Sequence, residues 1–344
     1  MENGRWIVNR LTIDEAMQQF LYDIGSKKQD RTRRTYQTAV NHFQAFLEAN
    51  DLSPHQVVTE LTVKHGMDFA AWLVNQHFGR RQVKPSTLRT YLTAVHRFYR
   101  FLLLRDYALI SYTDLERLQE EYSEYGRIKR RLPPHVEDEV IEAIVAAARQ
   151  VSPATEDTPA ARRYELRRLR DIALVEALRS TGARVGELAN LRRGDLEYSR
   201  RRARVRAEST KGVSERYIYF DGRAWAALTT YLTARSDGGG GRALSENPIF
   251  ARHSRNAGQR VLPLSTWSME KVVRRLGQLA GRLDAHITPH AFRHWFATRM
   301  QRATGNLAVT QDALGHNSPE TTRIYARIDE DDIQWAHQQV FGKA

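Results

Sequence analysis

The sequence predicts a mainly α-helical protein with an N-terminal helical bundle and an α-rich second domain that contains a small antiparallel β-hairpin. Apolar residues recur at helical intervals through most of the 344 residues. Strand-like alternation is confined to residues 203–220. Two consecutive prolines, Pro133 and Pro134, interrupt the helical pattern and separate the two parts.

The composition indicates a polyanionic partner. The formal charge is +13 and the pI is near 10.0, so nucleic acid is the obvious class, with a merely soluble basic protein as the alternative. The absence of cysteine excludes disulfides, thiol chemistry and cysteine-ligated zinc. No apolar run approaches the ~20 residues that span a bilayer, and residues 1–6 lack a signal-peptide core. A cytoplasmic protein without a membrane partner is therefore expected.

Residues 1–115 are predicted to form the helical bundle. Thr12 and Glu15 have the spacing of a capping box, and Pro85 supplies the proline that is favoured at a helix start. Apolar residues at intervals of three and four mark the core-facing sides. Five helices are predicted. Four of them start at Thr12, after the basic stretch 27–34, at Ser53–Pro54 and at Pro85, and the other contains the apolar residues 67–73.

Residues 116–134 are predicted to be an interdomain linker, because they are highly charged and end in two prolines. The cations near the end of this segment would suit a strap that passes along a duplex. A solvated linker is the alternative for each of them. The cations concerned are Lys129, Arg130 and Arg131.

Residues 135–328 are predicted to form the second domain, with helices joined by polar loops. The alternation at 203–207 and 216–220 predicts a hairpin with Lys211 at its tip. The helices are expected at 136–148, 169–178, 183–188, 224–234 and 266–280, and the loops at 151–161 and 235–247.

Cations also lie between the apolar positions of the bundle and beside the predicted hairpin. A solvated surface explains them as well as contact with nucleic-acid phosphates does, and the sequence favours neither interpretation. The candidates for such contact are Arg33, Arg34, Lys84, Arg89, Arg97, Arg100, Arg200, Arg201 and Arg202.

A helix start lies near the end of the second domain. Thr288 offers a capping oxygen, and Pro289 lacks an N–H that would be unpaired at that position. His290 and Arg293 are three residues apart, so they share one face of this helix.

A later helix is expected to end at Leu314–Gly315, with Gly315 in the left-handed conformation and His316 just beyond it. Ser318–Pro319 starts another helix, and Tyr325 falls about two turns into it. Two imidazoles, a guanidinium and a phenol are thus expected on short, rigid pieces. Side chains of these types are suited to chemistry on a phosphate.

The spacings resemble the signature of the tyrosine recombinases, the phage-integrase family. The H-x-x-R pair His290–Arg293 is followed 23 residues later by His316, and Tyr325 follows nine residues after that. The family's arginine box, T-G-x-R-x-x-E-L, is matched at every fixed position by T-G-A-R-V-G-E-L at 181–188. T-K-G at 210–212 is similar to its hairpin lysine motif. The layout resembles the simpler, Cre-like members, in which a helical core-binding domain precedes the catalytic domain.

The resemblance implies an enzyme that transfers DNA strands. Tyr325 would attack a phosphodiester in line and form a 3′-phosphotyrosyl link, which conserves the phosphoester energy without ATP. Arg184 and Arg293 would each hold the non-bridging oxygens in a fork. His316 would donate a further hydrogen bond to the same oxygens.

Two further residues are implied in the proton transfers. His290 would help to take the tyrosyl proton, and Lys211 would give a proton to the departing 5′-oxygen. Glu187 is expected to support a neighbour. Because two arginines supply positive charge, no metal or other cofactor is expected. In the alternative, His290 and His316 bind a metal, but no Asp, Glu or Cys completes a site at usable spacing.

The resemblance also implies partners: double-stranded DNA with an inverted-repeat recombination site, bound by a homotetramer that works through a Holliday junction. Residues 329–344 are expected to be a tail that docks on a neighbouring protomer, with packing on its own domain as the alternative. Two other functions stay open, a type IB topoisomerase-like nicking-closing enzyme and an inactive DNA-binding regulator. The arginine box and the hairpin favour the recombinase. An inactive regulator would normally have lost one of the six catalytic residues, which are Arg184, Lys211, His290, Arg293, His316 and Tyr325.

Overall fold

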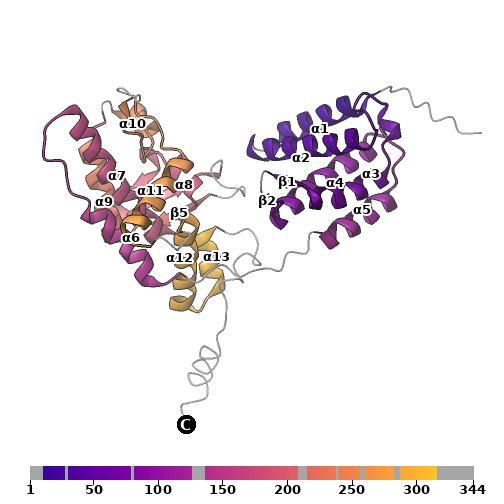
Figure 1. Ribbon diagram of the computed structural model, residues 1–344. Helices are drawn as coiled ribbons and strands as arrows, with labels where there is room; N and C mark the ends of the chain where they lie inside the picture. Colours follow the sequence, from indigo (N-terminus) through magenta and orange to yellow (C-terminus); the bar gives the residue numbers. More distant parts are fainter. Residues whose placement is uncertain are drawn as a thin grey trace, which may run out of the picture. The chain divides into compact units, whose positions relative to one another are not determined.

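The computed structural model describes residues 11–27, 30–78, 81–125, 136–207, 215–237, 240–255, 260–282 and 287–315. Within these ranges the fold is mainly helical, as predicted, with a small antiparallel sheet in the C-terminal part (Figure 1). The chain divides into two compact units, residues 1–131 and 132–344. No helix in the described ranges is long and apolar enough to cross a membrane.

The first unit is a helical bundle, as its apolar periodicity predicts. Two-residue strands pair as a short antiparallel hairpin between its third and fourth helices. Its elements are α1 (Ile13–Lys27), α2 (Asp30–Ala49), a 3₁₀ turn (Val58–Glu60), α3 (Val63–Asn75), β1 (His77–Phe78), β2 (Arg81–Gln82), α4 (Pro85–Leu104) and α5 (Tyr112–Tyr125).

Aromatic rings from four helices form the centre of this bundle. The rings of Phe43 and Phe69 meet edge to face with centroids 5.1 Å apart, and those of Phe20 and Phe98 are 5.5 Å apart. All four side chains are buried. Tilted and edge-to-face pairs of this kind add to the free energy gained by burying the rings.

The capping box at the start of α1 is confirmed. The backbone N–H of Thr12 donates to Glu15 Oε2 at 2.8 Å, and the N–H of Glu15 donates to Thr12 Oγ1 at 3.2 Å. The prediction of a helix that starts at Ser53–Pro54 is wrong, because the element between α2 and α3 is the 3₁₀ turn Val58–Glu60. The carbonyl of Pro54 instead accepts from the N–H of Asp14 at 2.9 Å, so this segment caps α1 and is not free to continue a helix of its own.

The linker expected at 116–134 begins too early, because residues up to Tyr125 belong to α5. Leu115, Leu118 and Tyr122 follow one another at intervals of three and four and are buried. The Tyr122 hydroxyl donates to the carbonyl of Gly66 at 2.8 Å, which fixes α5 on the bundle. The charged residues between them form its solvent side and hid the helical pattern. Residues 126–135, with Lys129, Arg130 and Arg131, lie outside the described residues.

The second unit contains the predicted hairpin within a three-stranded antiparallel sheet of order β3-β4-β5, where Ala203 pairs with Leu196 and Ile218. Its elements are α6 (Asp138–Gln150), α7 (Pro159–Thr181), α8 (Val185–Asn190), a 3₁₀ turn (Arg193–Asp195), β3 (Leu196–Glu197), a 3₁₀ turn (Tyr198–Arg200), β4 (Arg202–Val205), β5 (Arg216–Tyr219), α9 (Gly222–Arg235), α10 (Gly241–Glu246), α11 (Thr266–Leu279), α12 (Pro289–Thr304) and α13 (Leu307–Leu314).

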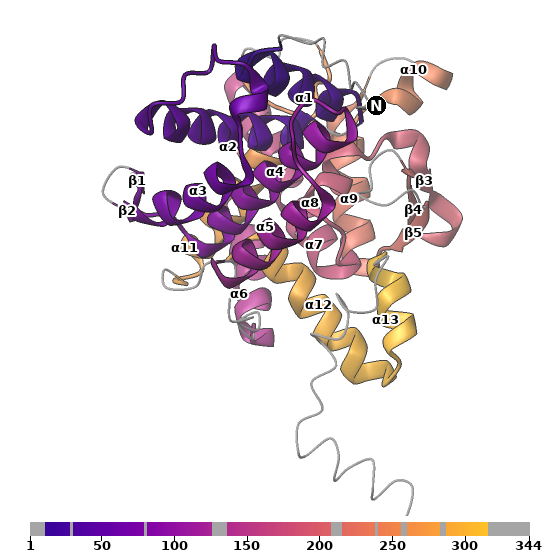
Figure 2. The same cartoon turned by 90° about the vertical axis from the view of Figure 1, so that its right-hand side faces the viewer.

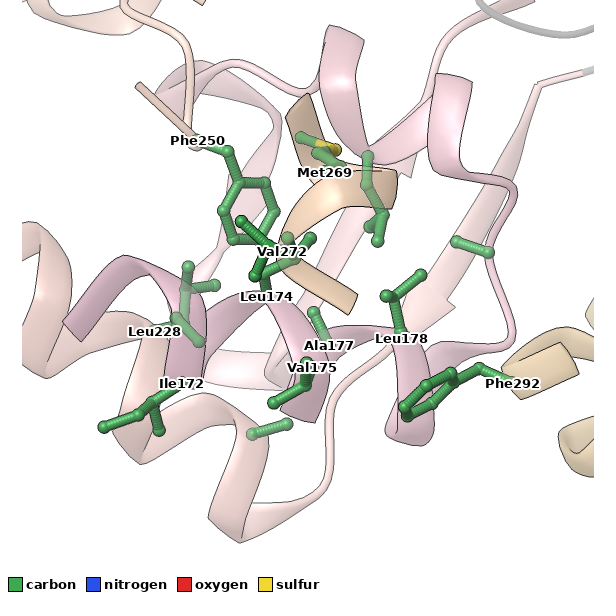
Figure 3. Packing of buried hydrophobic residues seen from close by; sticks show 14 of the residues in the cluster. Ile172, Leu174, Val175, Ala177, Leu178, Leu228, Phe250, Met269, Val272 and Phe292 are labelled. Carbon is green, nitrogen blue, oxygen red and sulfur yellow. The ribbon is translucent and has the colours of Figure 1, made fainter. Parts of the chain in front are cut away.

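The core of this unit forms around α7. Its residues Leu174 and Leu178 pack with Phe250, Met269 and Phe292, which come from other elements (Figure 3). Helix α7 is buried on several sides along its second half, so an apolar stripe on one face does not describe it. It ends where the site described below begins.

Two segments predicted to be loops contain helical residues. The loop expected at 151–161 ends at Thr158, whose hydroxyl accepts from the N–H of Ala161 at 3.1 Å and starts α7 ten residues before the predicted helix start. The loop expected at 235–247 contains the short α10. Its glycines concealed a single helical segment, because glycine lowers helix propensity without forbidding a helix.

Helices α12 and α13 lie side by side in both views of the molecule (Figures 1 and 2). The predicted start of α12 is confirmed, since the Thr288 hydroxyl accepts from the N–H of Ala291 at 3.3 Å and Pro289 is the first helical residue. The predicted end of α13 is confirmed as well, because Gly315 caps it with a φ of 62°.

Candidate active site

Arg184 lies at a sharp corner between two helices. Helix α7 ends at Gly182, which has a φ of 57°, and the chain turns at once into α8. Arg184 is the residue directly before the first turn of α8, whereas the helix expected at 183–188 would include it in that turn. Its side chain is 31% exposed, so the guanidinium is held at the surface of the unit and is open to a ligand.

Glu187 is the carboxylate beneath Arg184, and its side chain is only 1% exposed. Its Oε1 accepts from Arg184 Nη1 at 2.9 Å and its Oε2 accepts from the Arg184 backbone N–H at 2.7 Å. Burial by itself raises the pKa of Glu187, but the hydrogen bonds and charges of Arg216 and Arg184 outweigh it and hold the pKa below its usual value. Glu187 is therefore an ionised carboxylate that touches Arg184 and is shielded from solvent.

Arg216, the first residue of β5, is a member of this cluster that the sequence analysis missed. Its Nη1 and Nη2 donate to the two oxygens of Glu187 at 2.9 and 2.8 Å. A signal was present, since Arg216 alternates in phase with the buried Ile218 and Phe220. A cation on the buried face of a strand needs a buried counterion.

Arg293 of α12 ties the same corner to the end of α13. Its side chain is buried, with Nη1 donating to the carbonyl of Gly182 at 2.8 Å and Nη2 donating to the carbonyl of Leu314 at 2.7 Å. Both Arg184 Nη atoms approach the carbonyl of Gly315 at 3.4 Å. The two arginines thus converge on Leu314–Gly315, directly before His316 in the chain.

His290 lies one turn before Arg293 on α12 and is exposed. Partial burial of the ring, and then the charges of Arg293 and Arg184, lower the pKa of His290. A neutral imidazole can accept a proton, so this position suits a general base.

His294 is a second histidine that the sequence analysis did not single out. Its ring meets that of His290 edge to face with centroids 4.2 Å apart. Burial, His290 and Arg293 lower the pKa of His294 to about 4. Its spacing of four residues from His290 on one helix was the available signal.

Three of the six predicted catalytic residues, Arg184, His290 and Arg293, are therefore brought to one place in the second unit. Lys211, His316 and Tyr325 lie outside the described residues, as does the tail 329–344. In the sequence, Lys211 falls between β4 and β5, and His316 follows Gly315.

The candidates for DNA contact are distributed over both units. Arg201 has a left-handed φ of 46° and is exposed. Arg202 is instead engaged by the protein, stacked 3.7 Å from the ring centroid of Tyr217 and donating to Glu197 at 2.8 Å. The remaining described candidates are exposed: Arg33, Arg34, Lys84, Arg89, Arg97, Arg100 and Arg200.

The arrangement favours a phosphate. The guanidiniums of Arg184 and Arg293 converge on Leu314–Gly315, and the buried Glu187 orients Arg184 without covering it. The same two cations contribute to lowering the pKa of His290. Fixed arginine forks of this kind are suited to holding charged phosphate oxygens.

Similarity to known proteins agrees with this chemistry. Residues 136–331 match the Phage integrase family, and residues 17–106 match the Phage integrase, N-terminal SAM-like domain. Tyrosine recombinase XerC of Syntrophus aciditrophicus (strain SB) is 26% identical over 338 residues, which cover 96% of this chain and 99% of the relative. Tyrosine recombinase XerC of Vibrio campbellii (strain ATCC BAA-1116) is 29% identical over 293 residues, which cover 83% and 82%.

Solved structures share the fold. XerH site-specific recombinase bound to a palindromic difH substrate, a post-cleavage complex, has a TM-score of 0.66 at 16% identity and covers 96% of this chain and 97% of its own. The Tn1549 transposon integrase in complex with a circular intermediate DNA has a TM-score of 0.65 at 15% identity, with coverages of 96% and 99%. With more than half of its residues matched by the catalytic-domain family, this chain belongs to the phage integrase family and is a tyrosine recombinase.

Proposed function

We propose that this enzyme cuts and rejoins DNA at a specific site through a 3′-phosphotyrosyl intermediate on Tyr325. The observation that carries the proposal is the convergence of Arg184 and Arg293 on Leu314–Gly315, beside His290. The residues that follow Gly315 in the chain include His316 and Tyr325. A phosphate held between the two arginines would lie beside Gly315, the last described residue before these two in the chain.

The roles follow from charge and protonation. Attack on the phosphodiester develops charge on the non-bridging oxygens, and Arg184 and Arg293 neutralise it, each such donor being worth about 10²–10³-fold in rate. His290, neutral because its pKa is lowered, takes the tyrosyl proton. His316 donates to the same oxygens and Lys211 protonates the departing 5′-oxygen. Two arginines in this position make a metal clamp unnecessary, and no cofactor is proposed.

The DNA partner is proposed on two grounds. The solved relatives named above are complexes with DNA, and the chain carries a formal charge of +13. The exposed cations of the first unit would meet phosphates, and their contribution would weaken steeply with salt. We propose a homotetramer on an inverted-repeat site, exchange through a Holliday junction, and docking of residues 329–344 on a neighbouring protomer.

The test is covalent trapping on a nicked suicide substrate. Wild-type protein should become attached to DNA, whereas Tyr325→Phe should bind the site equally well and form no adduct, because phenylalanine lacks the hydroxyl. Tyr219→Phe, an exposed tyrosine on β5, is the matched control and should behave as wild type. Adduct formation by Tyr325→Phe would show that the nucleophile is another residue.

A second assay separates recombination from the other two functions. Two sites on one plasmid should be exchanged by wild-type protein, with a four-way junction trapped when the second strand exchange is blocked. Relaxation of supercoiled DNA without any exchange would indicate the topoisomerase-like function. Binding without cleavage would indicate a regulator.

A further inference from the structure

We propose that Arg216 is a positioning residue for strand cleavage, which keeps Arg184 available to the scissile phosphate and supports Gly315 at the end of α13. The inference rests on the proposed function of this site. It concerns a residue whose two Nη atoms both donate to Glu187 and whose side chain is 10% exposed, whereas that of Arg184 is 31% exposed.

The first step is the pairing of Arg216 with Glu187. The contact is bidentate, and it uses both oxygens of a carboxylate that is almost completely buried. This fork fixes the plane of the carboxylate, as parallel arginine–carboxylate pairs do. The same two oxygens then accept hydrogen bonds from Arg184, Oε1 from its side chain and Oε2 from its backbone N–H.

The second step is charge. A buried carboxylate that faced Arg184 alone would neutralise it, since the pair would carry no net charge. With Arg216 present, the three groups carry one net positive charge, and that charge is on the exposed side where Arg184 lies. Arg216 thus balances Glu187 and leaves the charge of Arg184 for a phosphate.

The third step is the fit of Arg216 against Gly315. A Cβ atom added to Gly315 would lie 2.7 Å from Arg216 Cδ and 2.9 Å from Arg216 Nε, so the arginine stem lies directly against this glycine. Within the described part of the chain, the buried Nε has no hydrogen-bond partner, and the position of the guanidinium is determined by its two contacts to Glu187. The same side chain therefore supports Arg184 and the end of α13.

The test measures single-turnover cleavage by Arg216→Met on two substrates. One has an ordinary scissile phosphate, and the other has a methylphosphonate, which carries no charge on its non-bridging oxygen. We expect a loss of about 10–100-fold on the ordinary substrate, below the ~10²–10³-fold for removing a direct donor. The loss should be several-fold smaller on the methylphosphonate, because less charge has to be held. Arg274→Met, an exposed arginine on α11, is the matched control and should cleave both like wild type.

The double variant Glu187→Gln/Arg216→Met tests the charge argument. If Arg216 acts by balancing Glu187, removing both partners should restore part of the rate lost in Arg216→Met, because no buried carboxylate is left to neutralise Arg184. Multiplicative losses, or an equal loss on both substrates, would overturn the proposal. Should Arg216→Met fail to fold, judged by circular dichroism and thermal melting, the neutral Arg216→Gln on the two substrates decides in the same way.

The outcome is separable from that of the proposed function. Covalent attachment by wild-type protein together with an unchanged rate in Arg216→Met would reject the positioning role alone. Failure of wild-type protein to attach to any substrate would instead reject the proposed function.

Discussion

Replacing Gly182 by alanine should destabilise the second unit, because two independent obstacles meet at this residue. Gly182 has a φ of 57°, which side-chain-bearing residues adopt at a cost. An added Cβ would also lie 2.3 Å from Phe296 Cδ1 and 2.6 Å from Phe296 Cγ, inside the van der Waals radii. The carbonyl of the same residue accepts the hydrogen bond from Arg293, so the displacement would reach the site.

The size of the effect follows from these two obstacles. The left-handed conformation costs about 1–2 kcal/mol for a residue with a Cβ. Overpacking against the partly buried Phe296 ring, which packs on the core, costs about 1–3 kcal/mol more. Together they lower the free energy of unfolding by about 2–5 kcal/mol. At about 2–4 °C for each kcal/mol in a domain of this size, the melting temperature should fall by roughly 4–20 °C.

Thermal denaturation of the full chain, followed by circular dichroism, measures this shift. Gly186→Ala is the matched control, because Gly186 lies in α8 with no atom within 4 Å of an added Cβ and no positive φ. It should leave the melting temperature unchanged or raise it, since alanine favours a helix. In Gly182→Ala/Phe296→Leu, the melting temperature should recover the loss caused by the clash with the ring but not the loss caused by the positive φ. Equal melting temperatures for Gly182→Ala and Gly186→Ala would refute this reasoning. So would a double variant that melts no higher than Gly182→Ala.

Three further predictions concern protons and metal. Burial lowers the pKa of His253 and His294 to about 4, so between pH 6.5 and about 4 the unfolded chain binds more protons than the folded chain. The melting temperature should therefore fall as the pH is lowered through this range, and it should fall less in His294→Gln. A melting temperature that does not change with pH would contradict this prediction. Lys211→Ala should cleave an ordinary site slowly but cleave well when sulfur replaces the bridging 5′-oxygen, because a thiolate departs without a proton. Equal sulfur rescue of Arg184→Ala would exclude Lys211 as the acid. Cleavage should persist in excess EDTA, and a loss restored by Mg²⁺ but not by salt adjustment would show that a metal takes part.

Helix ends with local chemical signals could be predicted from the sequence. Thr288–Pro289 and Gly315 needed no knowledge of the rest of the fold, because a capping hydroxyl, a proline and a left-handed glycine act within one turn. The same kind of signal, Thr158–Pro159, starts α7 and was overlooked. The residues after it are polar around the helix, and periodicity indicates only where an apolar face repeats.

Arg216 illustrates what local signals cannot supply. Its alternation with Ile218 and Phe220 places it on the buried face of β5, and a buried guanidinium requires a counterion. The neighbouring Glu215 is exposed, so the counterion has to come from another element.

Five described carboxylates of the second unit lie deep enough to serve as that counterion, and the sequence does not distinguish them: Asp171, Glu176, Glu187, Asp195 and Asp237. Asp195 lies near Arg206, and Asp237 pairs with Arg193 and Arg235. Asp171 pairs with Arg170 and Arg275, and Glu176 pairs with Arg149, Arg179 and Arg223. Among these described carboxylates it is Glu187 that pairs with Arg216, because the corner at Gly182 turns the chain into α8. The motif around Arg184 therefore identifies the group that would meet the phosphate, whereas the group that balances its carboxylate emerges only when helix, corner and strand are assembled.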